Sequence, residues 1–278
     1  MRVQKGTAVT VRTEPFDDTP SAVTVAAVRT SDGSTISTAP TGAVINNSVD
    51  VSLTAAAHTD ELDELTVTVS ATVDSLATLQ IFTVDIVGSH YMTVGSLRAE
   101  PQLSDAARYP DALIAEFRDE MCEYVERAAN VAYTPSFAQE TWVGNGTSVI
   151  VLRTHGATSL TSLTIDGVAQ TVSGFELLDG GLLHYKSGVF TAGEPIVVSL
   201  EHGYVRPPPQ LNREVKHAIR SNLLSRSSQA PSNRLWEQTP DGLTVRYSTP
   251  DWAERRFTGM MDLDAAILAY RWPDIGFA

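Results

Sequence analysis

The stretch VVSLEHGYVRPPPQLNREVKHAIRSNLLSR, residues 197–226, joins two kinds of secondary structure. Its first residues alternate between apolar and polar, as in a β-strand, and the residues after Pro207, Pro208 and Pro209 predict an amphipathic helix. Proline has no N–H to donate to a sheet, but it fits the first turn of a helix. The sequence therefore predicts that the strand ends at a rigid corner formed by residues 207–209.

The helix predicted after this corner has an apolar stripe and a basic stripe. The apolar stripe consists of Leu211, Val215, Ala218 or Ile219, and Leu223. The basic stripe, spaced three and four residues apart, consists of Arg213, Lys216 and Arg220. The whole chain is acidic, with a net charge of −13. An acidic body argues against wrapping around duplex nucleic acid, because phosphate neutralisation needs a dense basic surface.

The first 97 residues predict β-structure throughout. Short segments of period two are separated by turn signals, and each places apolar residues on one face, such as Val49, Val51 and Leu53. This pattern predicts an antiparallel, immunoglobulin-like β-sandwich. The acidic segment HTDELDEL, residues 58–65, lacks the spacing of a calcium loop, so a solvated turn is favoured over a metal site.

Helical periodicity begins near residue 98, and residues 103–135 predict a helix with Pro110 in its first turn. The predicted apolar face consists of Leu113, Phe117, Met121, Tyr124 or Val125, and Ala128. The predicted acidic face consists of Glu116, Asp119, Glu120, Glu123 and Glu126. Cys122 lies inside this pattern, which favours a buried, inert thiol over a nucleophile.

Residues 137–202 return to short strands and predict a small β unit inserted between two helices, with hairpin turns at Asp166–Gly167 and at residues 179–181. Residues 225–250 lose all periodicity and predict an extended loop. A short helix is expected at about 262–272, followed by a tail with large apolar side chains. The chain is therefore expected to be α+β, with a sandwich domain over residues 1–97 and a helical domain over residues 98–278 that carries the β insertion.

No constellation of catalytic residues emerges from the sequence. The six histidines show no metal-ligand spacing, and no P-loop or G-x-S-x-G elbow is present. The prediction is a protein that is not an enzyme, with no cofactor and no metal. No apolar run approaches the length of a membrane span, so no membrane association is expected.

The order of these elements resembles the head-to-tail adaptor, or head completion, proteins of long-tailed phages, particularly those of actinobacteria. The resemblance covers roughly residues 104–272. It rests on YPDALIAEF and ANVAYTP around the first helix, on TWVGNG and SLTSLTIDG in the strands, on HGYVRPPPQLNREVKHAI, and on TGMMDLDAAILAYR. The first hundred residues lie outside it and look like an added sandwich.

The resemblance implies a ring of twelve copies under the portal of the capsid, which continues the DNA channel towards the tail. It implies as partners the portal protein, the next head-completion or tail protein and passing double-stranded DNA. The location it implies is the head–tail junction of the virion, after assembly in the host cytoplasm. The alternative, from the sandwich alone, is a baseplate or receptor-binding protein of the tail.

Two sets of residues are candidates for contacts in such a ring. The basic stripe faces either the acidic residues Glu116, Glu120 and Glu123 of a neighbouring subunit, which we favour, or the channel. The C-terminal segment contacts a neighbour or the portal through Leu263, Ile267, Tyr270, Trp272 and Phe277, unless it folds back on its own core.

Overall fold

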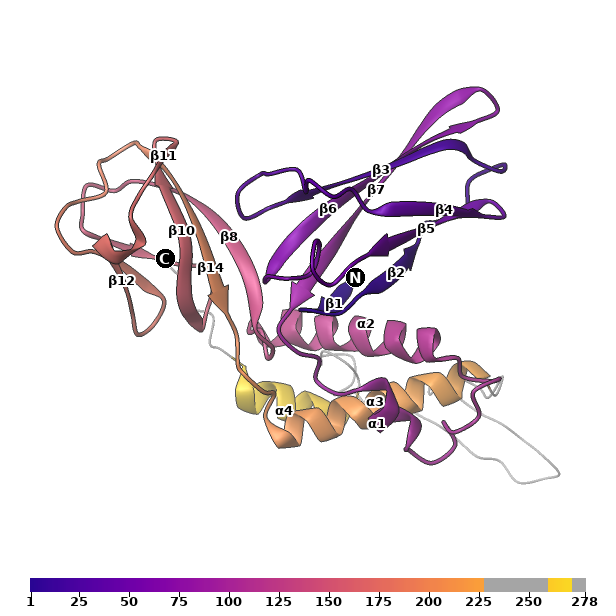
Figure 1. The fold of residues 1–278 in the computed structure, drawn as a ribbon. Helices are drawn as coiled ribbons and strands as arrows, with labels where there is room; N and C mark the ends of the chain where they lie inside the picture. The colour runs from indigo at the N-terminus through magenta and orange to yellow at the C-terminus, as the bar shows by residue number, and fades with distance from the viewer. Residues whose placement is uncertain (228–259, 272–278) are drawn as a thin grey trace. The chain divides into compact units, whose positions relative to one another are not determined.

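The computed structural model describes residues 1–227 and 260–271, and it confirms the α+β class (Figure 1). The chain forms two units. Unit 1 consists of Met1–His90 and Thr134–Val205, and unit 2 consists of Tyr91–Tyr133 and the residues from Arg206 onwards. Each unit is therefore assembled from two separate stretches of chain.

The N-terminal part of unit 1 is built from two sheets of a β-sandwich, ordered β1-β7-β6-β3 and β2-β5-β4. The strands are β1 (Arg2–Gln4), β2 (Val9–Arg12), β3 (Ser21–Arg29), β4 (Thr41–Ile45), β5 (Ser48–Leu53), β6 (Asp63–Val73) and β7 (Leu76–Val87). Val49, Val51 and Leu53 are at most 1% exposed, as their spacing predicts. The sheets are not wholly antiparallel as expected, because β1 pairs with β7 in parallel.

The acidic segment at residues 58–65 is only in part the solvated turn expected from its composition, since Asp60 and Glu61 are exposed. His58 and Asp63 are buried, and the ring of His58 lies 2.7 Å from the carbonyl oxygen of Thr38. The Asp63 carboxylate accepts hydrogen bonds from the backbone N–H and the hydroxyl of Ser31, and it lies near the Arg29 guanidinium. The Asp63 carboxylate therefore fixes a turn of the sandwich through partners that lie far away in the sequence.

The second part of unit 1 contains two further sheets, ordered β11-β10-β14-β8 and β12-β13-β9. Its elements are β8 (Ser136–Val143), β9 (Val149–Val151), β10 (Ala157–Ile165), β11 (Val168–Ala169), the 3-10 turn η1 (Val172–Gly174), β12 (Phe175–Leu178), β13 (Leu182–Tyr185) and β14 (Pro195–His202). The hairpins predicted at Asp166–Gly167 and at residues 179–181 are both present. Phe175, Leu183, Phe190 and Val198 belong to a separate core.

Glu140 of β8 is the main buried charge of this second part of unit 1. Its carboxylate accepts hydrogen bonds from the Trp142 indole N–H and from the backbone N–H groups of Arg153 and Thr154. The Arg153 guanidinium also stacks on the Trp142 ring. Burial opposes ionisation of Glu140, but these hydrogen bonds outweigh it and hold the pKa of the carboxyl below its ordinary value.

This lowered pKa predicts a loss of stability in acid. The Glu140 contribution is fully present above about pH 4.3, the ordinary pKa of glutamate, and is lost as the pH falls through the lower folded-state pKa. We expect Glu140→Gln to lower the free energy of unfolding by about 1.5–3 kcal/mol at pH 7 and to flatten its acid dependence. Urea unfolding between pH 3 and pH 7 measures the free energy of unfolding and its dependence on pH. Glu176→Gln, at an exposed position of β12, is the control, and equal effects of the two substitutions would contradict the prediction.

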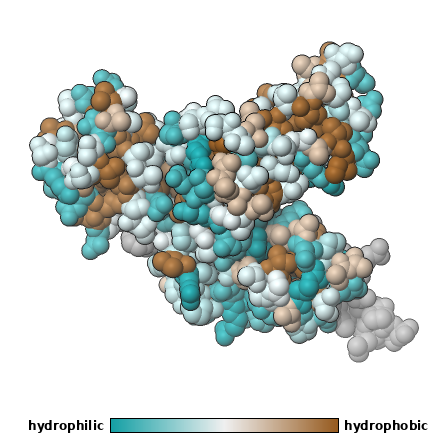
Figure 2. Space-filling view, viewed as in Figure 1, coloured by the Kyte–Doolittle hydropathy of each residue, from teal (hydrophilic) through white to brown (hydrophobic). Residues whose placement is uncertain are grey.

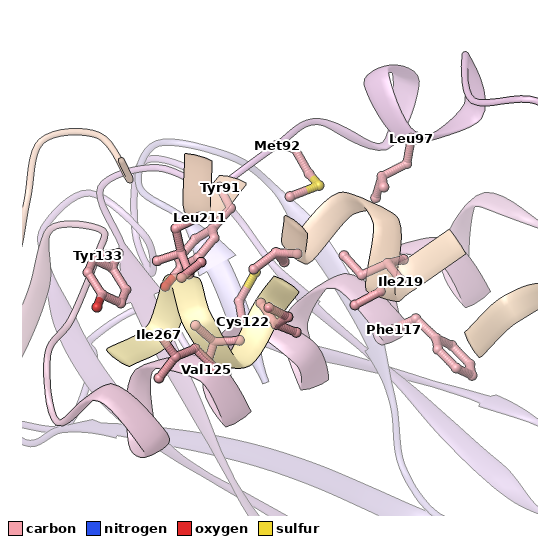
Figure 3. Packing of buried hydrophobic residues seen from close by; sticks show 14 of the residues in the cluster. Tyr91, Met92, Leu97, Phe117, Cys122, Val125, Tyr133, Leu211, Ile219 and Ile267 are labelled. Carbon is pink, nitrogen blue, oxygen red and sulfur yellow. The ribbon is translucent and has the colours of Figure 1, made fainter. Parts of the chain in front are cut away.

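Unit 2 is helical and consists of α1 (Val94–Arg98), α2 (Asp111–Ala129), α3 (Pro209–Ser227) and α4 (Met261–Tyr270). Figure 3 shows its apolar core, to which α2, α3 and α4 contribute Val125, Leu211 and Ile267, among others. The predicted apolar stripe of α3 is confirmed, since all of its residues are at most 2% exposed. No helix among the described residues is long and apolar enough to span a membrane.

The apolar face of α2 contains Phe117 and Val125 as predicted, but its other buried residues lie one position later than predicted. Its buried apolar residues are Ile114, Phe117, Cys122, Val125 and Ala129, whereas Leu113, Met121 and Ala128 are only partly buried. Tyr124 is 41% exposed. Helical spacing alone permits either set, because apolar residues occupy adjacent positions along this helix. The burial of Cys122 is confirmed.

The boundary of the helical unit falls before α1. Tyr91, Met92 and Leu97 are buried in the helical core, so residues 91–98 pack with α2 and α3. That residues 1–97 form a domain of their own stays a prediction. The extended loop expected at about 225–250 lies outside the described residues, except that residues 225–227 form the end of α3.

Candidate assembly surfaces

The strand does not end at the prolines, as the sequence suggested, but several residues earlier at His202. Gly203 follows with a φ of 100°, a conformation that favours glycine. Pro207 is buried, Pro208 is partly buried, and Pro209 is the first residue of α3. Asn212 then donates its backbone N–H to the Pro208 carbonyl oxygen and its side-chain amide to that of Tyr91. The three prolines therefore start the helix rather than stop the strand.

The basic stripe of α3 makes contacts within its own chain. Lys216 Nζ lies 2.7 Å from Glu100 Oε1, and the hydrogen bond from this ammonium group lowers the pKa of the Glu100 carboxyl. Arg220 donates to the carbonyl oxygen of Pro101 and to the side chain of Gln102. These two side chains thus fasten α3 to the segment between α1 and α2.

Arg213 differs from the other two members of the stripe. Its recorded partner is Glu214, the next residue along the helix, at 2.9 Å. Its side chain is 67% exposed. An exposed ion pair between sequence neighbours contributes little to stability. Arg213 is therefore the member of the stripe whose charge remains on the surface.

The acidic face of α2 is partly exposed and partly buried. Glu116 and Glu120 are exposed, and Glu123 pairs with Arg127 one turn later at 2.5 Å. Glu126, which was expected on the same solvated face, is only 7% exposed. Its carboxylate accepts hydrogen bonds from the Tyr91 hydroxyl and from the backbone N–H of Tyr133. The face available to another molecule therefore ends before Glu126.

Glu126 and Arg98 are structural residues that sequence reasoning missed. Glu126 joins the beginning and end of the first stretch of unit 2, where the rings of Tyr91 and Tyr133 pack edge to face. Arg98 donates to the carbonyl oxygens of Leu103 and Tyr109 and pairs with Asp111 at the start of α2. The burial of Glu126 could have been predicted from the sequence, because Glu126 directly follows Val125, which lies on the buried side of the helix.

The C-terminal helix packs against its own chain. Leu263, Ala266 and Ile267 are at most 1% exposed, and the Tyr133 hydroxyl donates to the Tyr270 carbonyl oxygen at 2.9 Å. The expectation that Leu263 and Ile267 contact a neighbour is therefore corrected, because the helical core already buries both side chains. Tyr270 is 36% exposed. Trp272 and Phe277, the other predicted contacts, lie outside the described residues.

The described residues contain no cluster of three or more histidine, cysteine, aspartate or glutamate side chains that could hold a metal ion. The features with a geometry suited to binding are instead surfaces. Unit 2 presents the acidic face of α2, formed by Glu116, Glu120 and Glu123, and the exposed cation of Arg213 on α3. Charged surfaces of this kind set the orientation and specificity of protein association more than its affinity.

Comparison with known proteins gives a structural likeness and no match to a described family. No protein-family model matches the chain, and no curated protein matches it. Among solved structures, the chain is similar to one described as the neck of an empty GTA particle computed with C6 symmetry. The sequences are 13% identical, the TM-score is 0.46, and the match covers 68% of this chain and 93% of that one.

Proposed function

We propose that the protein is a structural subunit of a ring that joins the portal vertex of a phage capsid to the tail and continues the DNA channel. The observation that carries the proposal is the composition of unit 2. The segments that resemble head-to-tail adaptors, YPDALIAEF, PPPQLNREVKHAI and MDLDAAILAY, are far apart in the sequence. Their helices α2, α3 and α4 nevertheless share one core. The helical part of the resemblance thus coincides with a single packed body, while its strand segments TWVGNG and SLTSLTIDG belong to unit 1.

In this proposal the ring contains twelve copies and contacts the portal protein on one side and the next head-completion or tail protein on the other. Double-stranded DNA passes through the channel, and the protein acts without catalysis or a cofactor at the head–tail junction of the virion. Assembly takes place in the host cytoplasm. Unit 2 supplies the ring contacts, and the immunoglobulin-like sandwich is an addition outside the adaptor body.

Electron microscopy of the purified protein in negative stain, alone and mixed with the portal protein, tests this function. The expected result is a closed ring with an axial hole, formed alone or on the portal. Compact trimers would instead support a baseplate or receptor-binding protein and overturn the proposal. So would a protein that forms no ring and shows no binding to the portal.

The subunit contact is testable through charge reversal. We propose that Arg213 faces Glu120 and its acidic neighbours on α2 of the next subunit. Arg213→Glu and Glu120→Lys should each weaken every subunit contact by about 1.5- to 5-fold, the effect of losing one exposed ion pair, and the fraction of protein in rings should fall by more because the loss repeats at each contact. The double variant should restore it, because the reversed charges attract again. Analytical ultracentrifugation measures the ring fraction.

The control for this experiment is Lys216→Glu. That substitution breaks the contact with Glu100 inside the same chain, so we expect it to lower stability without rescue by Glu120→Lys. If all variants form normal rings and only DNA retention or ejection changes, the basic stripe faces the channel and the proposed contact is wrong.

A further inference from the structure

The outer edge of strand β7 is open along most of its length. Its sheet has the order β1-β7-β6-β3, and β1 pairs with β7 only at Asp85–Val87. Residues 76–82 therefore pair with β6 on one side, and no strand among the described residues pairs with them on the other. The backbone groups directed to this side belong to Ala77, Leu79 and Ile81, by alternation from Asp85, whose N–H reaches Met1.

This open edge is apolar and lacks the features that normally protect an exposed edge from pairing with another chain. Natural edge strands carry charges, prolines or bulges that discourage pairing with another chain. Residues 76–82, LATLQIF, contain none of these charges or prolines, and β7 pairs with β6 without a bulge. Leu76, Leu79 and Ile81 are 71%, 57% and 60% exposed. Figure 2 shows hydrophobic surface where Figure 1 places the hairpin of β6 and β7.

Large exposed apolar side chains on this face of the sheet are concentrated on β7. Leu79 lies in one row with Ser70 of β6 and Thr24 of β3, and Ile81 lies in one row with Thr68 and Ala26. Small or polar residues therefore fill the rest of these two rows, and the large apolar residues of both rows lie on the strand with the open edge. The opposite edge strand, β3, is protected by an irregularity at residues 21–24, with Ala22 at a φ of 47°.

The open edge of β7 is complementary to itself. When two copies pair in antiparallel fashion about Leu79, the opposed residues are Leu76 with Phe82, Ala77 with Ile81, Thr78 with Gln80, and Leu79 with Leu79 of the second copy. Apolar residues thus lie opposite apolar residues, and polar residues lie opposite polar residues. Like charges would oppose pairing, but none lie opposite each other here. The groups of Ala77, Leu79 and Ile81 could form about six backbone hydrogen bonds across the junction.

We propose that the sandwich associates with a second copy of this chain through antiparallel pairing of residues 76–82 of β7. The pairing joins the β1-β7-β6-β3 sheets of two copies into one continuous sheet and covers Leu79 and Ile81. It has two-fold symmetry, so it joins copies that face each other and does not depend on the proposed ring. In the free protein it covers an edge that would otherwise recruit unrelated strands.

The association is tested on the full-length protein by measuring its mass over a range of concentrations with light scattering and sedimentation. Leu79→Lys places two like charges opposite each other and should weaken the association at least about tenfold, whereas Val168→Lys, at an equally exposed site on β11, should not. Leu79→Glu should behave as Leu79→Lys does. An equimolar mixture of these two variants should associate again, because the two-fold axis places position 79 opposite itself.

Cross-linking gives a second readout that does not depend on charge. Leu79→Cys should form a disulfide-linked dimer on mild oxidation, whereas the unmodified protein, whose single Cys122 is buried, and Val168→Cys should not. A monomeric unmodified protein at about 100 µM, a Leu79→Lys variant of unchanged mass, or equal cross-linking at positions 79 and 168 would each overturn the proposal. So would protection of Leu79→Cys only inside the virion, which would assign the edge to another protein. None of these outcomes decides whether unit 2 forms rings.

Discussion

Gly144→Ala is expected to unfold or strongly destabilise the second part of unit 1, with a loss of about 3–5 kcal/mol in the free energy of unfolding. A Cβ atom at position 144 would overlap the carbonyl oxygen of Thr191 and lie 3.1 Å from that of Phe190. Both groups belong to the backbone, so no side-chain rotation relieves the overlap. The loop between β8 and β9 would have to move away from the segment before β14.

This close approach holds the two segments together through backbone hydrogen bonds. Gly144 donates its N–H to the Glu194 carbonyl oxygen, Gly193 donates to that of Gly144, and Gly146 donates to that of Phe190. Displacement of residues 144–146 therefore breaks several bonds at once. It also disturbs Phe190, which is fully buried beside Phe175. The glycines of the motif GNG, residues 144–146, therefore have a structural explanation in this close approach.

Gly174→Ala is the matched control for Gly144→Ala. No atom lies within 4 Å of a Cβ built at Gly174, and its φ is not in the left-handed region. We expect this substitution to change stability by less than about 0.5 kcal/mol. Circular dichroism gives the unfolding midpoints, and hydrogen exchange of peptides from residues 136–202 locates the loss. Equal effects of the two substitutions would contradict the steric explanation.

Ile267→Ala is expected to destabilise unit 2 by about 2–5 kcal/mol, because it removes a fully buried side chain and leaves a cavity between α4 and its neighbours. The adjacent residue, Leu268, is 50% exposed, so Leu268→Ala should cost less than about 0.5 kcal/mol. Chemical unfolding of the two variants compares the loss of stability when side chains of similar size are removed from a buried and from an exposed position of the same helix.

Removal of residues 261–278 extends the same test to the whole segment. The truncation would expose the surface of α2 and α3 that Leu263, Ala266 and Ile267 cover, so we expect loss of helical structure or precipitation. A truncated protein that stays folded and loses only its binding to the portal would show instead that the segment is an assembly element. In that case the packing of α4 on its own chain would not be needed for folding.

Periodicity was sufficient to predict most elements and their buried faces. Alternation placed Val49, Val51 and Leu53 in the sandwich core, and spacing of three and four placed Leu211, Val215 and Ile219 in the helical core. The hairpin at Asp166–Gly167 also followed from local chemistry, since both residues adopt the positive φ that such a turn requires. These features depend on residues close together in the chain, which is why the sequence reveals them.

The candidate surfaces were less predictable, because their residues find partners far away in the sequence. The sequence presents Lys216 and Arg220 as a free basic stripe, but the tertiary structure places Glu100 and Pro101 beside them. Glu126 belongs to an acidic run, and it is buried because Tyr91 and Tyr133 meet beside it.

The amino-acid sequence by itself determined the α+β class, the change from strands to helices, and which helices are amphipathic. Only the tertiary structure decided which of two adjacent rows of α2 faces the core and that α4 packs on its own chain. It also decided that the outer edge of β7 at residues 76–82 has no partner strand among the described residues. The physical reason is that propensity and periodicity act between near neighbours, whereas burial of Ile267 or exposure of Leu79 depends on which segments meet in space.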